Sequence, residues 1–223
     1  VCDALKKLTT SGKYIEQLVS NILDITILED GRQKLNPCET SVSGISSTLS
    51  HIFAQELMND ELNITFSCHD ILYEYVMADG LKLKHIYSKL LSNSIKFTPT
   101  GGDITFALSE ERIDNSNKIL LVERISDTGI GIKPEFQADM FNKFTRETDT
   151  RINNVRGSGL GLAIVKELVD LMNGNIEVDS SVGKGTSITI TVEVPFIIKD
   201  DLWTGDRDYA TDITSVCSGK HLL

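Results

Sequence analysis

The sequence is short of positive charge, of paired cysteines and of long apolar runs. Its 223 residues carry 22 Lys plus Arg against 32 Asp plus Glu, a net charge of -10 that argues against general affinity for nucleic acid or anionic membranes. The four cysteines form no CxxC pair, so neither a zinc site nor a disulfide framework is indicated. Because no apolar run approaches the roughly 20 residues of a membrane span and no signal-peptide pattern opens the chain, we expect a cytoplasmic, soluble chain. A longer protein could still be membrane-anchored.

Two common nucleotide-binding motifs are also missing. The P-loop pattern GxxxxGK[ST] does not occur. The stretch RGSGLGLAIVKEL, residues 156–168, has glycines in a GxGxG pattern, but the polar segment before it is not the strand that a dinucleotide-binding Rossmann turn requires. These glycines still precede a helix whose free N–H groups and positive dipole end suit a phosphate. By itself this loop is a weak indication of a phosphate site.

Hydrophobic periodicity predicts helices and strands within one α+β domain. Helices are expected at residues 5–29, 42–58, 79–98, 134–141 and 161–174. The third begins at the N-cap Asp79 and ends at Thr98, because Thr98 precedes Pro99. The last begins after Gly161 and ends at the Asn-Gly pair 173–174. Strands are expected at residues 64–66, 104–108, 119–126, 176–178 and 188–194. A long polar loop at 129–157 surrounds the short helix, and loops of that length are usually functional or mobile.

One predicted strand contains an irregularity. The charged pair Glu123-Arg124 falls inside the strand that leads to Asp127 and upsets its alternation of apolar and polar residues. We expect a β-bulge there.

The helix after Asp79 has two different sides. An apolar side and a polar stripe are separated at about 100° per residue. The apolar side holds Leu83, Ile86, Tyr87, Leu90, Leu91 and Ser94, and the stripe holds Lys82, His85, Lys89, Asn93 and Lys96. Taken alone, the stripe is typical of an ordinary solvated face. Further on, ISDTGIGI at residues 125–132 puts a carboxylate at a strand end before two glycines, which lets the backbone approach a flat ligand.

The order of these elements resembles the ATP-binding domain of sensor histidine kinases, in the Bergerat-type class shared with gyrase, mismatch-repair and heat-shock chaperone ATPases. DGLKLKHIYSKLLSNSIKFTPTGG is similar to the asparagine box, SDTGIGI and GSGLGLAIVKEL to the two glycine boxes, MFNKFTR to the phenylalanine box, and GNIEVDSSVGKGTSITITVEVP to the closing hairpin. The match covers roughly Leu5 to Pro195. It implies a two-layer α/β sandwich, with a mixed sheet, helices on one face and an ATP lid loop, preceded by a dimerisation helix.

The resemblance implies ATP and Mg²⁺ as cofactors and assigns roles to residues. Asn93 would coordinate Mg²⁺, with Lys96 and Lys89 as further catalytic candidates, and Asp127 would accept a hydrogen bond from the adenine amino group. Arg146, Arg151 and Arg156 are candidates to meet the γ-phosphate. The implied nucleotide-binding set is Asn93, Lys96, Asp127, Gly129, Gly131, Ile132, Phe144, Arg146, Arg156, Gly157, Ser158, Gly159, Leu160, Gly161, Leu162 and Thr186.

The same resemblance divides the chain into three parts and implies partners. Residues 1–34 would be the second helix of the dimerisation and phosphoacceptor hairpin, 35–196 the ATP-binding catalytic domain and 197–223 a tail or linker. We expect a homodimer through the N-terminal helix and a response-regulator receiver domain as partner, with no nucleic acid and no direct membrane contact.

Two departures from the family pattern keep alternatives open. None of His51, His69, His85 and His221 stands in the acceptor box, so we expect the chain to transfer phosphate only to a histidine supplied elsewhere. Lys89 stands where the kinases usually carry an asparagine and the hydrolysing relatives a general-base glutamate. The first hypothesis is an ATP-dependent protein-histidine kinase; the second is a pseudokinase that binds nucleotide without transfer. A serine kinase of the anti-sigma type is the third.

Overall fold

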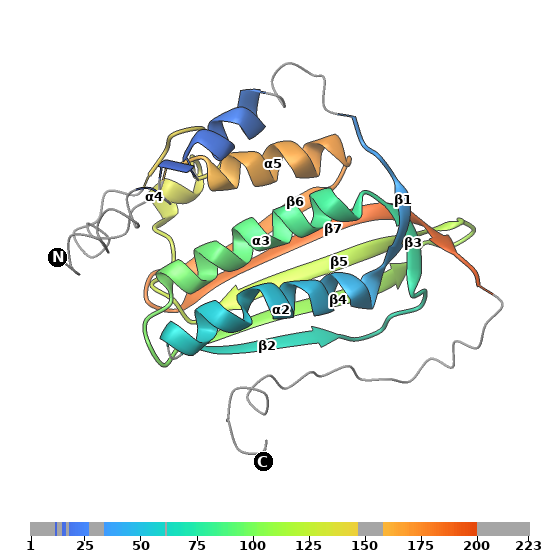
Figure 1. The fold of residues 1–223 in the computed structure, drawn as a ribbon, viewed down its shortest axis with the longest axis horizontal. Helices are drawn as coiled ribbons and strands as arrows, with labels where there is room; N and C mark the ends of the chain where they lie inside the picture. Colours follow the sequence, from blue (N-terminus) through green and yellow to red (C-terminus); the bar gives the residue numbers. More distant parts are fainter. Residues whose placement is uncertain are drawn as a thin grey trace, which may run out of the picture.

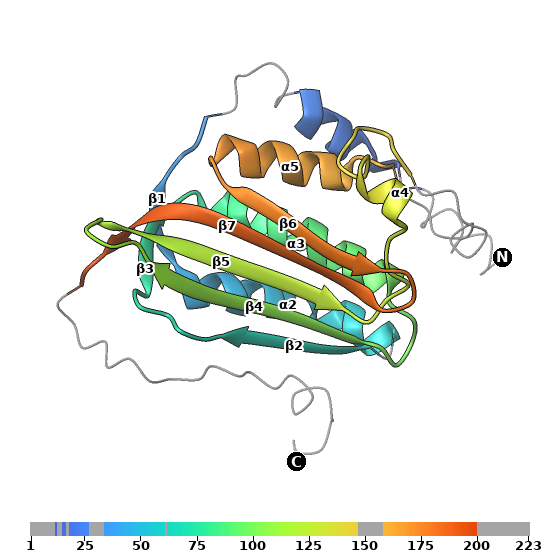
Figure 2. The same cartoon turned by 180° about the vertical axis from the view of Figure 1, so that it is seen from behind.

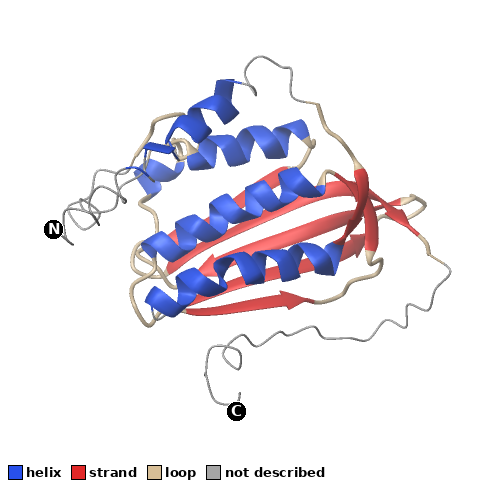
Figure 3. Ribbon diagram, in the orientation of Figure 1, coloured by secondary structure: helices blue, strands red, loops and turns tan. Residues whose placement is uncertain are grey.

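The computed structural model describes residues 12, 15–16, 18–26, 34–60, 62–146 and 158–199. It has two layers, a mixed sheet and a layer of helices on one of its faces, which confirms the predicted α+β sandwich (Figures 1 and 3). The helices are α2 (Val42–Asp60), α3 (Gly80–Phe97), α4 (Pro134–Gln137) and α5 (Gly161–Leu171), and residues 18–26 are helical as well. The strands are β1 (Cys38–Ser41), β2 (Asn63–Cys68), β3 (Tyr75–Ala78), β4 (Asp103–Arg112), β5 (Lys118–Asp127), β6 (Asn175–Ser181) and β7 (Gly185–Ile197).

The sheet order places the end of β5 beside the start of β7. The strands run β1-β3-β7-β5-β4-β2, and β6 also pairs with β7. The pair β2–β4 is parallel and the other pairs are antiparallel. In this register Asp127, the last residue of β5, lies opposite Thr186 near the start of β7. Two residues far apart in sequence therefore meet at one end of two neighbouring interior strands.

The core lies between the sheet and helices α2, α3 and α5 (Figure 1). On α3 the predicted apolar side is buried as a whole, and the ring of Tyr87 packs edge-on against Phe106 of β4 at 5.7 Å between centroids. The predicted ends of α3 are also confirmed. The Asp79 carboxylate caps the helix by accepting from the Lys82 N–H, and Thr98 is extended before Pro99. Figure 2 shows the opposite face of the sheet, which no described helix covers.

Strands β1 and β3 were not predicted from the sequence. Each has four residues, which is too short for alternation to stand out, and they pair with each other. Because β3 also pairs with the end of β7, the sheet extends further than hydrophobic periodicity indicated. The predicted end of the first helix at residues 30–31 and most of the predicted tail lie outside the described residues.

The predicted bulge at Glu123-Arg124 is wrong. Every residue of β5 from 119 to 127 has one partner on β4 and one on β7, with no residue skipped. Alternation is kept because Arg124 points to the exposed face while Glu123 points inward and is completely buried. An acidic residue thus occupies a core position of the central strand.

A second buried acid, Glu110, supports the loop between β2 and β3. Its Oε2 accepts the N–H groups of Leu72 and Tyr73, both at 2.8 Å, and its Oε1 has no partner in the described part of the chain. Burial raises the pKa of Glu110 to about 7, although the two N–H groups oppose this rise. The folded protein therefore holds a proton at Glu110 that the unfolded chain releases at lower pH.

Glu110 should make folding stability fall with rising pH. Between the ordinary carboxyl pKa and about 7 the folded state binds more protons than the unfolded state, so stability decreases over this window and is level above it. Glu110→Gln keeps an acceptor for the loop and removes this dependence. The difference in unfolding free energy between wild type and variant should change by about 2 kcal/mol across the window, measured by urea unfolding. A difference that does not vary with pH would contradict the assignment.

Candidate functional site

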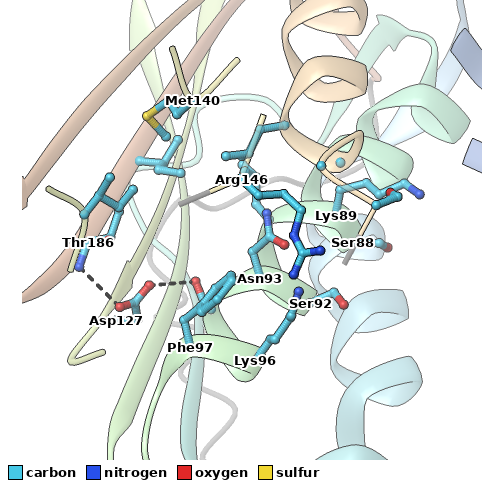
Figure 4. A pocket seen from close by; sticks show the side chains of 18 of the residues that line it. Ser88, Lys89, Ser92, Asn93, Lys96, Phe97, Asp127, Met140, Arg146 and Thr186 are labelled. Atoms are coloured by element: carbon cyan, nitrogen blue, oxygen red, sulfur yellow. Dashed lines mark hydrogen bonds between the residues drawn. The ribbon is translucent and has the colours of Figure 1, made fainter. Parts of the chain in front are cut away.

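A pocket of about 520 Å³ lies beside α3, the loop after β5 and the start of α5 (Figure 4). This volume is in the range of small-molecule sites. Of the predicted site residues, the pocket lining includes Lys89, Asn93, Lys96, Asp127, Gly131, Ile132, Arg146, Ser158, Gly159, Gly161, Leu162 and Thr186. Residues from all five motifs of the resemblance are therefore brought together.

The Asp127 carboxylate is held by three hydrogen bonds. Oδ1 accepts the N–H groups of Gly129 at 2.9 Å and Thr186 at 3.2 Å, and Oδ2 accepts the hydroxyl of Ser94 at 3.0 Å. Burial raises the pKa of Asp127, and these three donors oppose the rise. Ser94 was predicted as part of the apolar side of its helix, and nothing in its spacing indicated this contact.

The glycines after Asp127 allow the loop to pass close to its neighbours. Gly129 does not line the pocket, but a Cβ there would lie 2.7 Å from the carbonyl oxygen of Phe97. Gly131 has φ +67°, and a Cβ would lie 2.0 Å from the carbonyl oxygen of Ser181. Larger residues at either position would push the loop away from α3 or from the β6–β7 turn.

Apolar side chains form a wall of the pocket that the sequence did not single out. They come from the loop after β5, from α4 and its following turn, from α5 and from β7. The members are Ile130, Phe136, Met140, Leu162 and Ile188. Met140 is nearly fully buried and belongs to MFNKFTR, so the phenylalanine box was the available signal. A flat apolar ligand could pack here beside the Asp127 carboxylate.

Basic groups gather around Asn93, away from Asp127 (Figure 4). In that view the Arg146 guanidinium and the Lys96 ammonium are drawn on the same side of the pocket as the Asn93 amide. Burial, and secondly the charge of Arg146, lowers the pKa of Lys96. Two cations held near each other in a pocket favour an anionic ligand that relieves their repulsion.

Lys89 points to the helical segment 18–26. Its ammonium donates to Oδ1 of Asn21, whose Nδ2 donates to the Ser158 hydroxyl at 3.2 Å. Burial lowers the pKa of Lys89, and the charge of Asp24 opposes this. Asn21 is 6% exposed and lines the pocket, although the sequence gave no reason to select it. The segment thus joins α3 to Ser158 in the glycine-rich loop that precedes α5.

The remaining predicted residues lie beside the pocket or outside the described residues. Phe144 is 68% exposed with φ +62°, and its N–H donates to the carbonyl of Gly159 at 3.0 Å. Leu160 is buried in the core and does not line the pocket. Arg151, Arg156 and Gly157 lie outside the described residues.

Comparison with known proteins identifies the family. The family described as "Histidine kinase-, DNA gyrase B-, and HSP90-like ATPase" matches residues 78–196. The chain is 34% identical over 184 residues to the autoinducer 2 sensor kinase/phosphatase LuxQ of Vibrio parahaemolyticus, covering 82% of the chain and 21% of that protein. It is 30% identical over 197 residues to the circadian input-output histidine kinase CikA of Synechococcus elongatus, covering 87% of the chain and 25% of that protein.

A solved structure shows the same fold. The full-length structure of ShkA in complex with AMPPNP aligns with a TM-score of 0.71 and 23% identity, over 85% of this chain and 38% of that one. The chain belongs to the histidine kinase, gyrase B and HSP90-like ATPase family, and its ATP-binding domain is of the histidine kinase catalytic type. It spans only a fifth to a quarter of the length of the curated relatives it matches.

Among the described helices, none is long and apolar enough to cross a membrane.

Proposed function

We propose that this chain is the catalytic portion of a two-component sensor histidine kinase. It binds Mg-ATP and transfers the γ-phosphate to a histidine on a dimerisation helix, for relay to a response-regulator receiver domain. The observation that carries this proposal is one pocket with an acceptor carboxylate, Asp127, at one end and the Asn93, Lys96 and Arg146 group at the other. The sensor-kinase relatives support the same reading.

The Asp127 end suits adenine. An ionised carboxylate accepts hydrogen bonds only, and the exocyclic amino group of adenine donates them. The apolar wall packs against the faces of the base, and Thr186 holds the carboxylate in place through its N–H. Gly129 and Gly131 keep the backbone close without side chains in the way.

The Asn93 end suits a magnesium-bound triphosphate. Among the described residues no group of three or more His, Cys, Asp or Glu side chains could hold a metal ion, so a protein-only cage is not built there. A single amide oxygen fits Mg²⁺ as one ligand among phosphate oxygens and waters. Asn93 would supply that oxygen, and the ion would neutralise charge on the phosphates. Lys96 and Arg146 neutralise further charge, which is the protein's main contribution to phosphoryl transfer.

We assign residues 35–196 to the catalytic domain, 1–34 to the second helix of a dimerisation hairpin and 197–223 to a tail or linker. Four apolar side chains of the first part are exposed, at 61%, 49%, 43% and 57%, and they are Ile15, Val19, Ile22 and Leu23. At about 100° per residue they lie on a different side of the helix from Asn21 and the buried Ile25. This apolar stripe supports a homodimer through the helix.

A pseudokinase rests on Lys89 alone, and the sensor-kinase relatives do not favour it. In the structure the Lys89 ammonium is hydrogen-bonded to Asn21. A lysine held in this way need not repel the metal ion near Asn93. We therefore expect Lys89→Asn to retain transfer.

The test combines this chain with a separate dimerisation hairpin that carries an acceptor histidine, radiolabelled ATP and Mg²⁺. Acid-labile, alkali-stable label should appear on the hairpin, and Asn93→Ala should lower the transfer rate about 100-fold or more because the metal loses its protein ligand. The control Asn175→Ala changes an exposed asparagine of β6 and should leave transfer unchanged. ATP binding without histidine label would favour the pseudokinase, and absence of ATP binding would reject both functions.

A further inference from the structure

The hydroxyl of Ser94 faces the ligand pocket from within α3. Ser94 is 6% exposed, lines the pocket and donates to Oδ2 of Asp127 at 3.0 Å. A serine inside a helix commonly donates to a carbonyl one turn earlier, but here the donor goes to another element. The backbone carbonyl of Ser94 accepts both the N–H and the hydroxyl of Thr98, which holds the last turn of α3 in position.

The Asp127 carboxylate accepts fewer hydrogen bonds than it has acceptor positions. A carboxylate has about four acceptor positions, two on each oxygen. Oδ1 uses two of them for Gly129 and Thr186, and Oδ2 uses one for Ser94. Within the part of the chain that the structure describes, one acceptor position on Oδ2 is left, and Asp127 lines the pocket. The carboxylate is therefore arranged to take one N–H donor from a ligand.

We propose that Ser94 is a positioning residue for nucleobase selection: its hydroxyl fixes Asp127 so that the last acceptor position receives the 6-amino group of adenine. This inference rests on the proposed ATP-binding function. A base with an oxygen at position 6 places a hydrogen-bond acceptor against Oδ2 of Asp127, which is also an acceptor, so its binding is disfavoured. A base with hydrogen at position 6 leaves the carboxylate oxygen unpaired.

The charge state of Asp127 agrees with this geometry. Burial raises the pKa of Asp127, and the Ser94 hydroxyl is among the donors that oppose the rise. Without that donor the carboxyl would take up a proton more readily, and a protonated oxygen could donate instead of accept. Ser94 thus favours the form of Asp127 that distinguishes an amino group from an oxygen.

The experiment is a binding cycle with two ligands and two variants of the whole chain. Calorimetric dissociation constants are measured for ATP and for purine riboside triphosphate, which has hydrogen in place of the 6-amino group. Ser94→Ala should weaken ATP binding about 10-fold and change binding of the analogue less than about twofold. Ser47→Ala is the matched control, because Ser47 is an exposed serine of helix α2 and does not line the pocket. It should leave both constants unchanged.

Other outcomes of this experiment would refute the role of Ser94, the contact between Asp127 and adenine, or the proposed function. Equal weakening of both ligands by Ser94→Ala would show that Ser94 only supports the structure, and no weakening of either would also refute the inference. Wild type that binds ATP and the analogue equally well would refute the contact between Asp127 and the amino group. Wild type that binds neither ligand would refute the proposed function itself.

Discussion

Asp127→Asn is expected to lower the affinity for ATP by at least about 100-fold while leaving the fold intact. In the wild type the N–H groups of Gly129 and Thr186 donate to Oδ1 of Asp127, and the amide oxygen of the asparagine can accept both of them. Its NH₂ group then replaces Oδ2, so a donor faces both the Ser94 hydroxyl and the amino group of adenine. The acceptor that the base needs has become a competing donor.

Equilibrium binding of ATP together with thermal unfolding measures this prediction. Asp179→Asn is the matched control, since it removes the same charge from an exposed position on β6. We expect unchanged ATP binding in the control and similar unfolding midpoints in both variants without nucleotide. Retained ATP affinity in Asp127→Asn would mean that the base does not bind at this carboxylate.

Glu123→Leu is expected to stabilise the folded protein by about 2–4 kcal/mol at neutral pH. Glu123 is 0% exposed, neither carboxyl oxygen has a partner in the described part of the chain, and its neighbours in the sheet are Leu108 and Ile190. Burial raises the pKa of Glu123 far above its usual range, so the folded protein holds it protonated. Leucine has a similar volume and no polar atoms to leave unpaired.

The stabilisation should increase with pH. The unfolded chain ionises Glu123 above about pH 4.5, while the folded chain keeps the proton, so wild-type stability falls by up to about 1.4 kcal/mol per pH unit and the leucine variant lacks this loss. Urea unfolding at several pH values measures the effect. Glu123→Gln should also remove the pH dependence, but it should stabilise the folded protein less than Glu123→Leu because the glutamine amide is still unpaired. Glu111→Leu, at an exposed position of β4, should change stability by less than about 0.5 kcal/mol. A destabilised Glu123→Leu would show that the carboxyl has a partner.

Local signals in the sequence predicted most of the elements around the pocket. The N-cap at Asp79, the stop before Pro99 and the alternation in β4 and β7 depend on neighbouring residues only, so they could be read directly. The order of the asparagine, glycine and phenylalanine boxes pointed to the family. Twelve of the predicted site residues line the pocket, because these motifs lie on α3, in the loop after β5, after α4, around the start of α5 and at the start of β7.

Other features depend on contacts between distant segments. In the sequence Glu123 interrupts the alternation of a strand. Its complete burial, in register with Leu108 and Ile190, shows that it faces the core. The short strands β1 and β3 exist because each pairs with the other and β3 pairs with β7. An acidic side chain without a partner in the core costs stability, so a rule based on residue type assigns it to the surface.

The sequence by itself determined the class of the domain and which motifs contribute to its site, because the order of these motifs along the chain resembles that of a known family. The tertiary structure decided which atoms meet there. Ser94 and Asp127 are 33 residues apart, and Lys89 and Asn21 are 68 apart. Neither contact has a local cause, since each arises only when α3 packs against the sheet on one side and against the helical segment 18–26 on the other.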